Sequence, residues 1–131
     1  MEQTISAGGV VLNKNGEVLV VSQQGTSWSL PKGHVEENED FITAARREVF
    51  EESGITDLQL VKELGSYERP RLDDQTEIKT IHMFLFKTNE LDLKPIDENN
   101  PEARWVNKYE VEKLLTAEKD IEFFENIKNQ L

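Results

Sequence analysis

Two apolar runs lie near the start of the chain and are separated by a polar turn. Residues 5–12 form the first run, and residues 17–22 form a second run rich in β-branched side chains. Between them, residues 13–16 read Asn-Lys-Asn-Gly, a composition typical of tight turns. Two such runs around an Asn/Gly turn predict a β-hairpin. Further on, Pro31 restricts Leu30 to extended geometry, so a short extended piece is expected before a loop at residues 32–34.

A helix is predicted in the next segment, ending at Gly54. Phe41, Ala45 and Val49 recur at i, i+4 and i+8, the spacing of one helix face, and they are expected to form its buried side. Asn38 belongs to the residue types that cap helix N-termini, so the helix is expected to begin there. Gly54 is suited to the left-handed position that ends a helix.

The remainder of the chain alternates between apolar segments and two polar, acidic loops at residues 68–77 and 89–101. Predicted strands cover residues 58–67, 78–87 and 103–106, and predicted helices cover residues 111–115 and 121–127. His82 lies inside the apolar run 78–87 and is expected to be a strand or core residue. The order of elements predicts an α/β fold with a mixed sheet and helices packed on it.

Composition narrows the class of protein. The chain has 131 residues, a common size for one domain, and a net charge of -11. Such acidity disfavours long nucleic acids and anionic membrane surfaces, because both are bound through Lys and Arg. The sequence has no cysteine and no apolar run long enough to span a membrane. Its first residues lack a basic region followed by a long apolar core, so they are not expected to be a secretory signal. We therefore expect a single cytoplasmic domain, residues 1–131, that does not bind membranes.

Three glutamates of the predicted helix are the strongest chemical signal. Glu48, Glu51 and Glu52 stand at i, i+3 and i+4, so their carboxylates project from one helix face. Like charges in this arrangement repel one another, which a bound cation would relieve. Mg²⁺ prefers oxygen ligands and is usually held by a few carboxylates together with substrate phosphates. The alternative is an ordinary solvated helix face.

The surrounding residues match a known signature. Nine positions carry it: Gly33, Glu39, Arg47, Glu48, Val49, Glu51, Glu52, Gly54 and Ile55. In this pattern the chain resembles the Nudix hydrolases, whose signature box here spans residues 33–55. The SAGGVVLN and EARWV segments are also similar to parts of that family. The resemblance implies a Nudix-type α/β/α sandwich with a mixed sheet and hydrolysis of a phosphoanhydride.

The resemblance also implies roles for the residues of the box. Glu48, Glu51 and Glu52, with the backbone carbonyl of Gly33, match the family's ligands for Mg²⁺, for which Mn²⁺ could substitute. Arg47 and Glu39 match residues that orient those ligands; the alternative for Arg47 is an ordinary surface ion pair with Glu51 or Glu48. The general base differs among family members. It could be a glutamate of the box or one from a loop outside it, where Glu98 and Glu102 are the candidates.

Substrate choice rests on a finer resemblance. The segments WSLPKGHVE and IKTIHMFLF resemble the diadenosine polyphosphate hydrolase branch, which implies that Lys32, His34 and Lys79 lie near the substrate phosphates. Tyr67 could stack on a base, or it could be an ordinary aromatic residue at a strand end. The favoured substrate is therefore of the diadenosine tetraphosphate type.

Several alternatives stay open. Within the enzyme class they are a nucleoside triphosphate pyrophosphohydrolase and an ADP-ribose pyrophosphatase. An RNA-end pyrophosphohydrolase is less favoured because the chain is so acidic. Outside that class, the fold could sense a nucleotide without cleaving it, or the acidic helix could dock a protein. The expected partner is a small nucleotide, and the expected assembly is a monomer or a homodimer.

Overall fold

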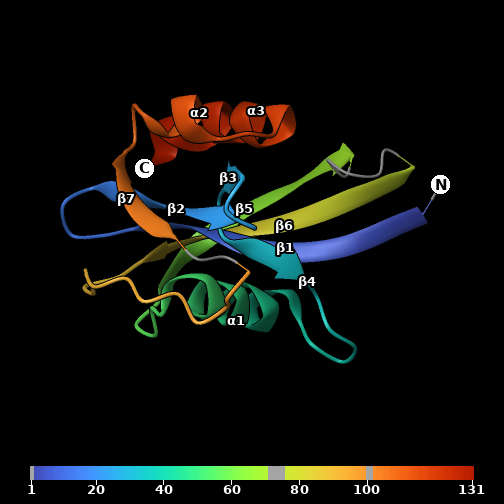
Figure 1. The fold of residues 1–131 in the computed structure, drawn as a ribbon, viewed down its shortest axis with the longest axis horizontal. Helices are drawn as coiled ribbons and strands as arrows, with labels where there is room; N and C mark the ends of the chain where they lie inside the picture. Colours follow the sequence, from blue (N-terminus) through green and yellow to red (C-terminus); the bar gives the residue numbers. More distant parts are fainter. Residues whose placement is uncertain (1, 71–75, 100–101) are drawn as a thin grey trace.

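The computed structural model describes residues 2–70, 76–99 and 102–131. Its strands form one mixed sheet, which lies between helix α1 on one face and helices α2 and α3 on the other (Figure 1). The predicted α/β fold with a mixed sheet is therefore confirmed. The elements are β1 (Glu2–Leu12), β2 (Glu17–Gln23), β3 (Ser27–Ser29), β4 (Lys32–His34), α1 (Phe41–Ser53), β5 (Gln59–Pro70), β6 (Glu77–Lys87), β7 (Ala103–Asn107), α2 (Val111–Leu114), α3 (Glu118–Ile127) and the 3₁₀ turn η1 (Lys128–Gln130).

Strand β1 lies at the centre of the sheet and changes partners along its length. Strand β6 runs parallel to it over its full length, whereas β2 pairs with it antiparallel at Leu12 and Val18. At residues 6–8, β1 pairs instead with the short antiparallel strand β4. Beyond Val18, β2 continues as the partner of β7 and β3. Strand β4 therefore occupies the place beside β1 where β2 has diverged.

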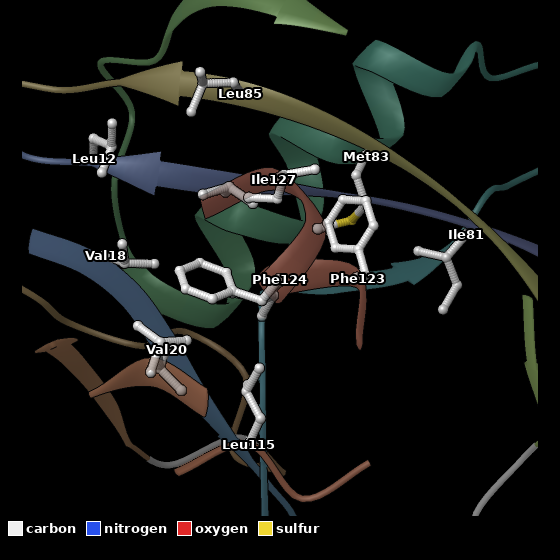
Figure 2. Packing of buried hydrophobic residues seen from close by; sticks show 13 residues of the cluster. Leu12, Val18, Val20, Ile81, Met83, Leu85, Leu115, Phe123, Phe124 and Ile127 are labelled. Carbon is white, nitrogen blue, oxygen red and sulfur yellow. The ribbon is translucent and has the colours of Figure 1, made fainter. Parts of the chain in front are cut away.

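Each face of the sheet carries its own hydrophobic core. On one face, Phe124 and Ile127 of α3 pack against side chains that include Met83 (Figure 2). On the other face, Val49 of α1 packs in a cluster that includes Phe84. Met83 and Phe84 point to opposite faces because side chains alternate along a strand. Full burial of one such side chain stabilises the fold by roughly 1.5–3 kcal/mol, so both helix layers are held firmly.

The start of α1 differs from the sequence prediction. Asp40, rather than Asn38, is the N-cap, and its carboxylate accepts a 2.8 Å hydrogen bond from the Thr43 amide. Asn38 has φ 66° and sits in the preceding turn, a conformation that asparagine tolerates better than most residues. Phe41 was predicted to be buried, but it is 38% exposed and stacks on His82 with ring centroids 3.9 Å apart. The helix ends at Gly54, as predicted.

Two further segments extend the sheet beyond the predicted strands. Residues 32–34, predicted as a loop, form β4 because β1 offers them a free edge. Strand β5 continues past Tyr67 to Pro70, since Glu68 and Arg69 still pair with β6. The middle of the predicted polar loop, residues 71–75, lies outside the described residues. Within the described residues, no helix is long and apolar enough to cross a membrane.

Candidate active site

Arg47 is the hub of the polar contacts on α1. Its Nε and Nη2 atoms donate to the two carboxylate oxygens of Glu39, at 2.8 and 2.9 Å. Its Nη1 atom donates to Glu48 at 2.8 Å and to Glu51 at 3.3 Å, and Nη2 also donates to the His34 carbonyl at 2.9 Å. The guanidinium group thus ties the helix to the loop before it and to β4. Arg47 therefore makes more contacts than the single surface ion pair that was the alternative interpretation.

Glu39 is held as an anion by this network. The hydrogen bonds from Arg47, followed by the backbone amide of Glu36, lower the pKa of Glu39 to about 2. Because this folded-state pKa is below the ordinary value of 4.5, the carboxylate stabilises the fold above about pH 4.5. That contribution is lost as the pH falls towards 2.

Replacing Glu39 with glutamine should therefore flatten the acid limb of the stability curve. We expect the free energy of unfolding to fall less steeply between pH 4.5 and 2 in Glu39→Gln than in the wild type. Urea unfolding across this range measures the slope. The matched control is Glu37→Gln, which changes an exposed acid of the same loop and should keep the wild-type slope. Equal slopes in wild type and Glu39→Gln would contradict the role assigned to the Arg47 contacts.

Gly33 of β4 lies directly against the carboxylate of Glu48. A Cβ atom placed on Gly33 would stand 2.3 Å from the Cδ and Oε2 atoms of Glu48, so a side chain here would displace the carboxylate. The same carboxylate is held from the other side by Arg47. Burial, as the largest effect, raises the pKa of Glu48, and the charge of Glu51 adds to it, while Arg47 opposes both. Glycine at this position is what leaves room for the Glu48 carboxylate against β4.

Glu52 is the most unusual side chain of the helix. It is only 1% exposed, and neither of its carboxylate oxygens has a hydrogen-bond partner among the described residues. Burial is the main cause that raises its pKa well above the usual range, and the nearby charge of Glu48 adds to this. The backbone amide of Lys32 lies near Glu52 but does not meet hydrogen-bond geometry. A buried carboxylate without donors is costly unless a cation compensates it.

These residues fit a hard divalent cation. Gly33, Glu48 and Glu52 come together between β4 and α1 and offer only oxygen donors, the kind that Mg²⁺ prefers. Glu51 is turned towards Arg47 instead, and its side chain is 38% exposed. In the part of the chain that the structure describes, no three acidic or histidine side chains stand close enough to hold a metal as they are. To surround an ion, these residues would need the carboxylate of Glu51 or Glu48 to move away from Arg47.

The four residues predicted to contact substrate share one face of the sheet. His34 pairs with Ser6 of β1, and Lys32 pairs with Gly8. Because side chains alternate along a strand, Ser6 and Gly8 lie on the same face as Val10, which is the face that carries α2 and α3. On the neighbouring strands, Tyr67 pairs with Ile81, and Lys79 lies two residues before Ile81. The register therefore gathers Lys32, His34, Tyr67 and Lys79 on the face opposite α1.

Lys32 and Tyr67 both contact one acid that the sequence analysis missed. Asp120 of α3 is fully buried, and its Oδ2 atom lies 3.2 Å from the Lys32 ammonium. Its Oδ1 atom accepts a 2.6 Å hydrogen bond from the Tyr67 hydroxyl, and Arg69 approaches within 3.7 Å. The Tyr67 ring stacks on Phe123 with centroids 4.5 Å apart. These partners account for both side chains without a ligand, so their contacts with substrate stay a prediction.

The negative charge of Asp120 and the positive charges of Lys32 and Arg69 stabilise one another. Burial would raise the pKa of Asp120, but the charges of Lys32 and Arg69 outweigh it and lower that pKa. Burial lowers the pKa of Lys32, and Asp120 opposes this effect. The ionised pair is the stable form, because two hydrogen bonds, from Lys32 and Tyr67, and the nearby charge of Arg69 surround the carboxylate. The sequence signal for Asp120 is its place in the stripe Asp120, Phe123, Phe124 and Ile127, an acid at a position where the helix spacing calls for an apolar residue.

The acidic loop after β6 is attached to the end of α1. The backbone amides of Ile96 and Asp97 donate to the Glu51 carbonyl at 2.8 and 3.0 Å, and the Lys94 amide donates to the Ser53 carbonyl at 2.8 Å. These bonds satisfy carbonyls that a helix C-terminus leaves without partners. Glu98 follows Asp97 directly and is exposed, so the structure brings this candidate base to the end of the box helix.

Glu102, the other candidate base outside the box, has a different setting. Its carboxylate pairs with Arg104 at 3.3 Å, and both side chains are more than half exposed. Its backbone amide and carbonyl bond to Ser22 of β2. Glu102 is thus fixed to the β2–β7 side of the sheet, whereas Glu98 follows the residues bonded to α1.

Comparison with known proteins decides the family. A model of the NUDIX domain matches residues 2–127, nearly the whole chain. The chain belongs to the Nudix family. An RNA pyrophosphohydrolase from Pelagibacter ubique is 35% identical to it over 116 residues, which cover 76% of this chain and 73% of that protein. This Nudix protein is therefore a hydrolase, as its box predicted.

Solved Nudix structures share the fold. An Ap4A hydrolase of C. elegans in a binary complex superposes with a TM-score of 0.81 at 23% identity, covering 97% of this chain and 96% of that one. The E. coli dihydroneopterin triphosphate pyrophosphohydrolase also gives 0.81, at 18% identity and with full coverage of both chains. At such identities the likeness supports the fold alone.

Proposed function

We propose that this Nudix hydrolase cleaves a pyrophosphate linkage in a nucleoside or dinucleoside polyphosphate, with diadenosine tetraphosphate as the favoured type of substrate. The observation that carries the proposal is Glu52, a buried carboxylate to which none of the described residues donates a hydrogen bond, placed beside Glu48 and Gly33. A protein that merely displayed an acidic helix to solvent or to a docking partner would have no reason to bury this group. This arrangement suits a cation that also binds a substrate phosphate.

Mg²⁺ is the proposed cofactor, with Mn²⁺ able to substitute. Glu48, Glu52 and the carbonyl of Gly33 would hold it, and Glu51 would join them after leaving Arg47. When bound, such an ion neutralises charge on phosphate oxygens and lowers the pKa of a coordinated water. Arg47 keeps Glu39 and Glu48 oriented, since ligands need neighbours that fix their geometry.

The remaining groups are proposed to bind substrate and to move a proton. His34 and Lys79 are proposed to contact a polyphosphate chain, and Lys79 would offset part of its charge. Lys32 is proposed to act there through its charge alone, because its ammonium group is already paired with Asp120. Glu98 is the candidate base outside the box, because the loop before it is bonded to the end of α1. A glutamate of the box is the alternative base.

A second candidate substrate is the 5′-triphosphate end of RNA. The Pelagibacter ubique relative, an RNA pyrophosphohydrolase, favours it. The net charge of -11 opposes it, because contacts to a long phosphate backbone depend on Lys and Arg. A short RNA end would demand fewer such contacts than a long chain. Nucleoside triphosphates and ADP-ribose are further candidates within the same chemistry.

A substrate panel tests the proposal. Diadenosine tetraphosphate, a nucleoside triphosphate, its oxidised form, ADP-ribose and a short 5′-triphosphate RNA are each incubated with the protein and Mg²⁺, and products are separated by chromatography. We expect diadenosine tetraphosphate to be hydrolysed with the highest kcat/KM, and the products, ATP with AMP or two molecules of ADP, identify the phosphorus that water attacks. Glu48→Gln should lose this activity, and the exposed Glu37→Gln should keep it. Binding of a nucleotide without cleavage of any substrate would instead support the sensing module.

A further inference from the structure

The sheet face that carries α2 and α3 becomes polar at the end where β1 and β6 begin. Figure 1 shows β1, β5 and β6 extending past α3 at this end. Ser6 of β1 pairs with Ile81 of β6, which still belongs to the hydrophobic core under α3. Two residues earlier on the same face, Thr4 pairs with Lys79, and Lys79 pairs in turn with Arg69 of β5. Beyond the core, this face is therefore lined by side chains that can donate hydrogen bonds.

Three of these side chains have buried polar atoms that lack a partner. The Oγ atom of Ser6, the Oγ1 atom of Thr4 and the Nε atom of Arg69 make no hydrogen bond with the described residues. Ser6 is 2% exposed and Arg69 is 5% exposed, so bulk water does not solvate them. A buried donor that stays unpaired destabilises the fold. A ligand with several acceptor oxygens would remove this cost.

The charges around these atoms favour an anionic ligand. Lys79 stands between Thr4 and Arg69 in one row across the sheet. Asp120 approaches Arg69 at 3.7 Å, but it faces the Nη1 atom and not the unpartnered Nε. Glu77 is an acid of the same face, and it lies one row further from the core than Lys79. A guanidinium group and two hydroxyl groups are donors that suit phosphate oxygens.

This group of donors begins next to the proposed metal site. Ser6 pairs with His34 on the side of β1 opposite β6, and His34 directly follows Gly33. Neighbouring strands lie about 4.8 Å apart, so three spacings of about 14 Å in total separate β4 from β5. A tetraphosphate chain that starts at the metal could continue past His34 towards Ser6 and Arg69. The diphosphate of ADP-ribose has fewer phosphates for the same path.

We propose that Ser6, Thr4 and Arg69 form a phosphate subsite, which holds the part of a polyphosphate chain that is remote from the metal. The two hydroxyl groups and the Nε atom of Arg69 donate to phosphate oxygens, and Lys79 adds its positive charge. The inference rests on the proposed function for the identity of the ligand. It adds to that function a preference for long phosphate chains over the diphosphate of ADP-ribose.

Inorganic tripolyphosphate is the probe that tests the subsite without catalysis. It is titrated into the full chain in metal-free buffer, and binding is measured by calorimetry. We expect wild type to bind it, and Ser6→Ala, Thr4→Val and Arg69→Met each to raise the Kd about tenfold, because each removes a hydrogen bond to a charged group. Circular dichroism confirms that each variant is folded, and the first two variants suffice if Arg69→Met is not.

Thr88→Val is the matched control, because it makes the same change as Thr4→Val at the other end of β1. Thr88 is 3% exposed, its amide donates to the Leu12 carbonyl, and its hydroxyl accepts a 3.1 Å hydrogen bond from the Glu90 amide. This variant loses a partnered hydroxyl, so it should melt below wild type and bind tripolyphosphate with an unchanged Kd.

Thermal melting separates a ligand subsite from a structural role. Ser6→Ala and Thr4→Val remove hydroxyl groups without partners, so in the absence of ligand both variants should melt at or above the wild-type temperature. Tripolyphosphate should raise the melting temperature of wild type more than that of either variant. A structural role would give the opposite result, with both variants melting below wild type in the absence of ligand.

Three results would overturn the proposal. They are a wild-type protein that does not bind tripolyphosphate, Ser6→Ala and Thr4→Val variants that bind it like wild type, and a loss of ligand-free stability in both variants. The last result would mean that the hydroxyl groups already have partners, such as buried water.

The substrate panel keeps the subsite distinct from the proposed function. If tripolyphosphate binding weakens in the variants but no substrate is cleaved, the subsite stands and the proposed hydrolysis is wrong. If diadenosine tetraphosphate is cleaved and Ser6→Ala and Thr4→Val leave both its KM and the Kd for tripolyphosphate unchanged, the hydrolysis stands and the subsite is wrong. If both proposals hold, the two variants raise the KM for diadenosine tetraphosphate more than the KM for ADP-ribose.

Discussion

Glu52→Gln should abolish most of the hydrolysis and, at the same time, stabilise the protein in the absence of metal. For activity we expect a fall in kcat of about a thousandfold. Metal ions supply several kcal/mol of transition-state stabilisation, and each tenfold in rate corresponds to about 1.4 kcal/mol. The variant keeps the size of the side chain, so the loss would come from the missing charge.

The gain in stability follows from the burial of the same carboxylate. Glu52 is 1% exposed, and its oxygens lack donors among the described residues, so the folded metal-free protein must either bury a desolvated charge or protonate the group, and both cost free energy. A glutamine amide carries no net charge and costs less to bury. In the presence of EDTA we expect the free energy of unfolding to rise by about 1 kcal/mol or more.

Thermal melting in EDTA measures the stability of the metal-free protein, and melting in Mg²⁺ measures the stabilisation that a bound metal adds. Glu52→Gln should melt above wild type in EDTA, and Mg²⁺ should stabilise wild type but not the variant. The control is Glu51→Gln, whose carboxylate is 38% exposed and already bonded to Arg47, and which should not gain stability in EDTA. If Glu52→Gln melts below wild type in EDTA, the carboxylate makes stabilising contacts in the metal-free protein. Its burial would then not be explained by cation binding.

Local patterns explain which parts of the fold could be predicted from the sequence. The hairpin turn and the end of α1 at Gly54 follow from residues whose conformational preferences act within a few positions. The reach of Arg47 to Glu48 and Glu51 is equally local, because a helix sets the spacing of its own side chains. For the same reason, the three box glutamates could be recognised as a group.

Contacts between distant segments explain what could not be predicted. Lys32 to His34 contain no β-branched run, and they form β4 only because β1 has an edge free there. Asp120 was placed outside the last helix, and the buried cations that it pairs with lie more than fifty residues away in sequence. The attachment of the loop before Glu98 uses backbone amides, which every residue except proline has. No side-chain pattern could indicate it.

The limits of local propensity also explain why the start of α1 was predicted wrongly. Both Asn38 and Asp40 belong to the residue types that favour N-caps, so propensity alone could not choose between them. The choice of Asp40 leaves Phe41 in the first turn, where it stacks on His82 of β6 instead of entering the core. The predicted stripe was right for Ala45 and Val49, which lie deeper in the helix and face the sheet.

Gly33→Ala should impair catalysis with little effect on stability. The added Cβ would fall 2.3 Å from the carboxylate of Glu48, which is the far end of a flexible side chain and can move away at small cost. The fold therefore loses little, and we expect the free energy of unfolding to change by less than about 1 kcal/mol. The displaced carboxylate, however, no longer lies between Gly33 and Arg47. A loss of about 10- to 100-fold in kcat/KM is expected, the range typical of disturbed metal-ligand orientation.

A double-mutant cycle shows whether the effect passes through Glu48. In Glu48→Gln the carboxylate is already gone, so adding Gly33→Ala should cost little further activity. Steady-state kinetics of the two single variants and the double variant, with chemical unfolding as a check on the fold, give the coupling. Full additivity would mean that Gly33 acts through its own backbone rather than by making room for Glu48. Strong coupling would instead identify the absence of one methyl group in β4 as the feature that lets a carboxylate of α1 reach the phosphate site.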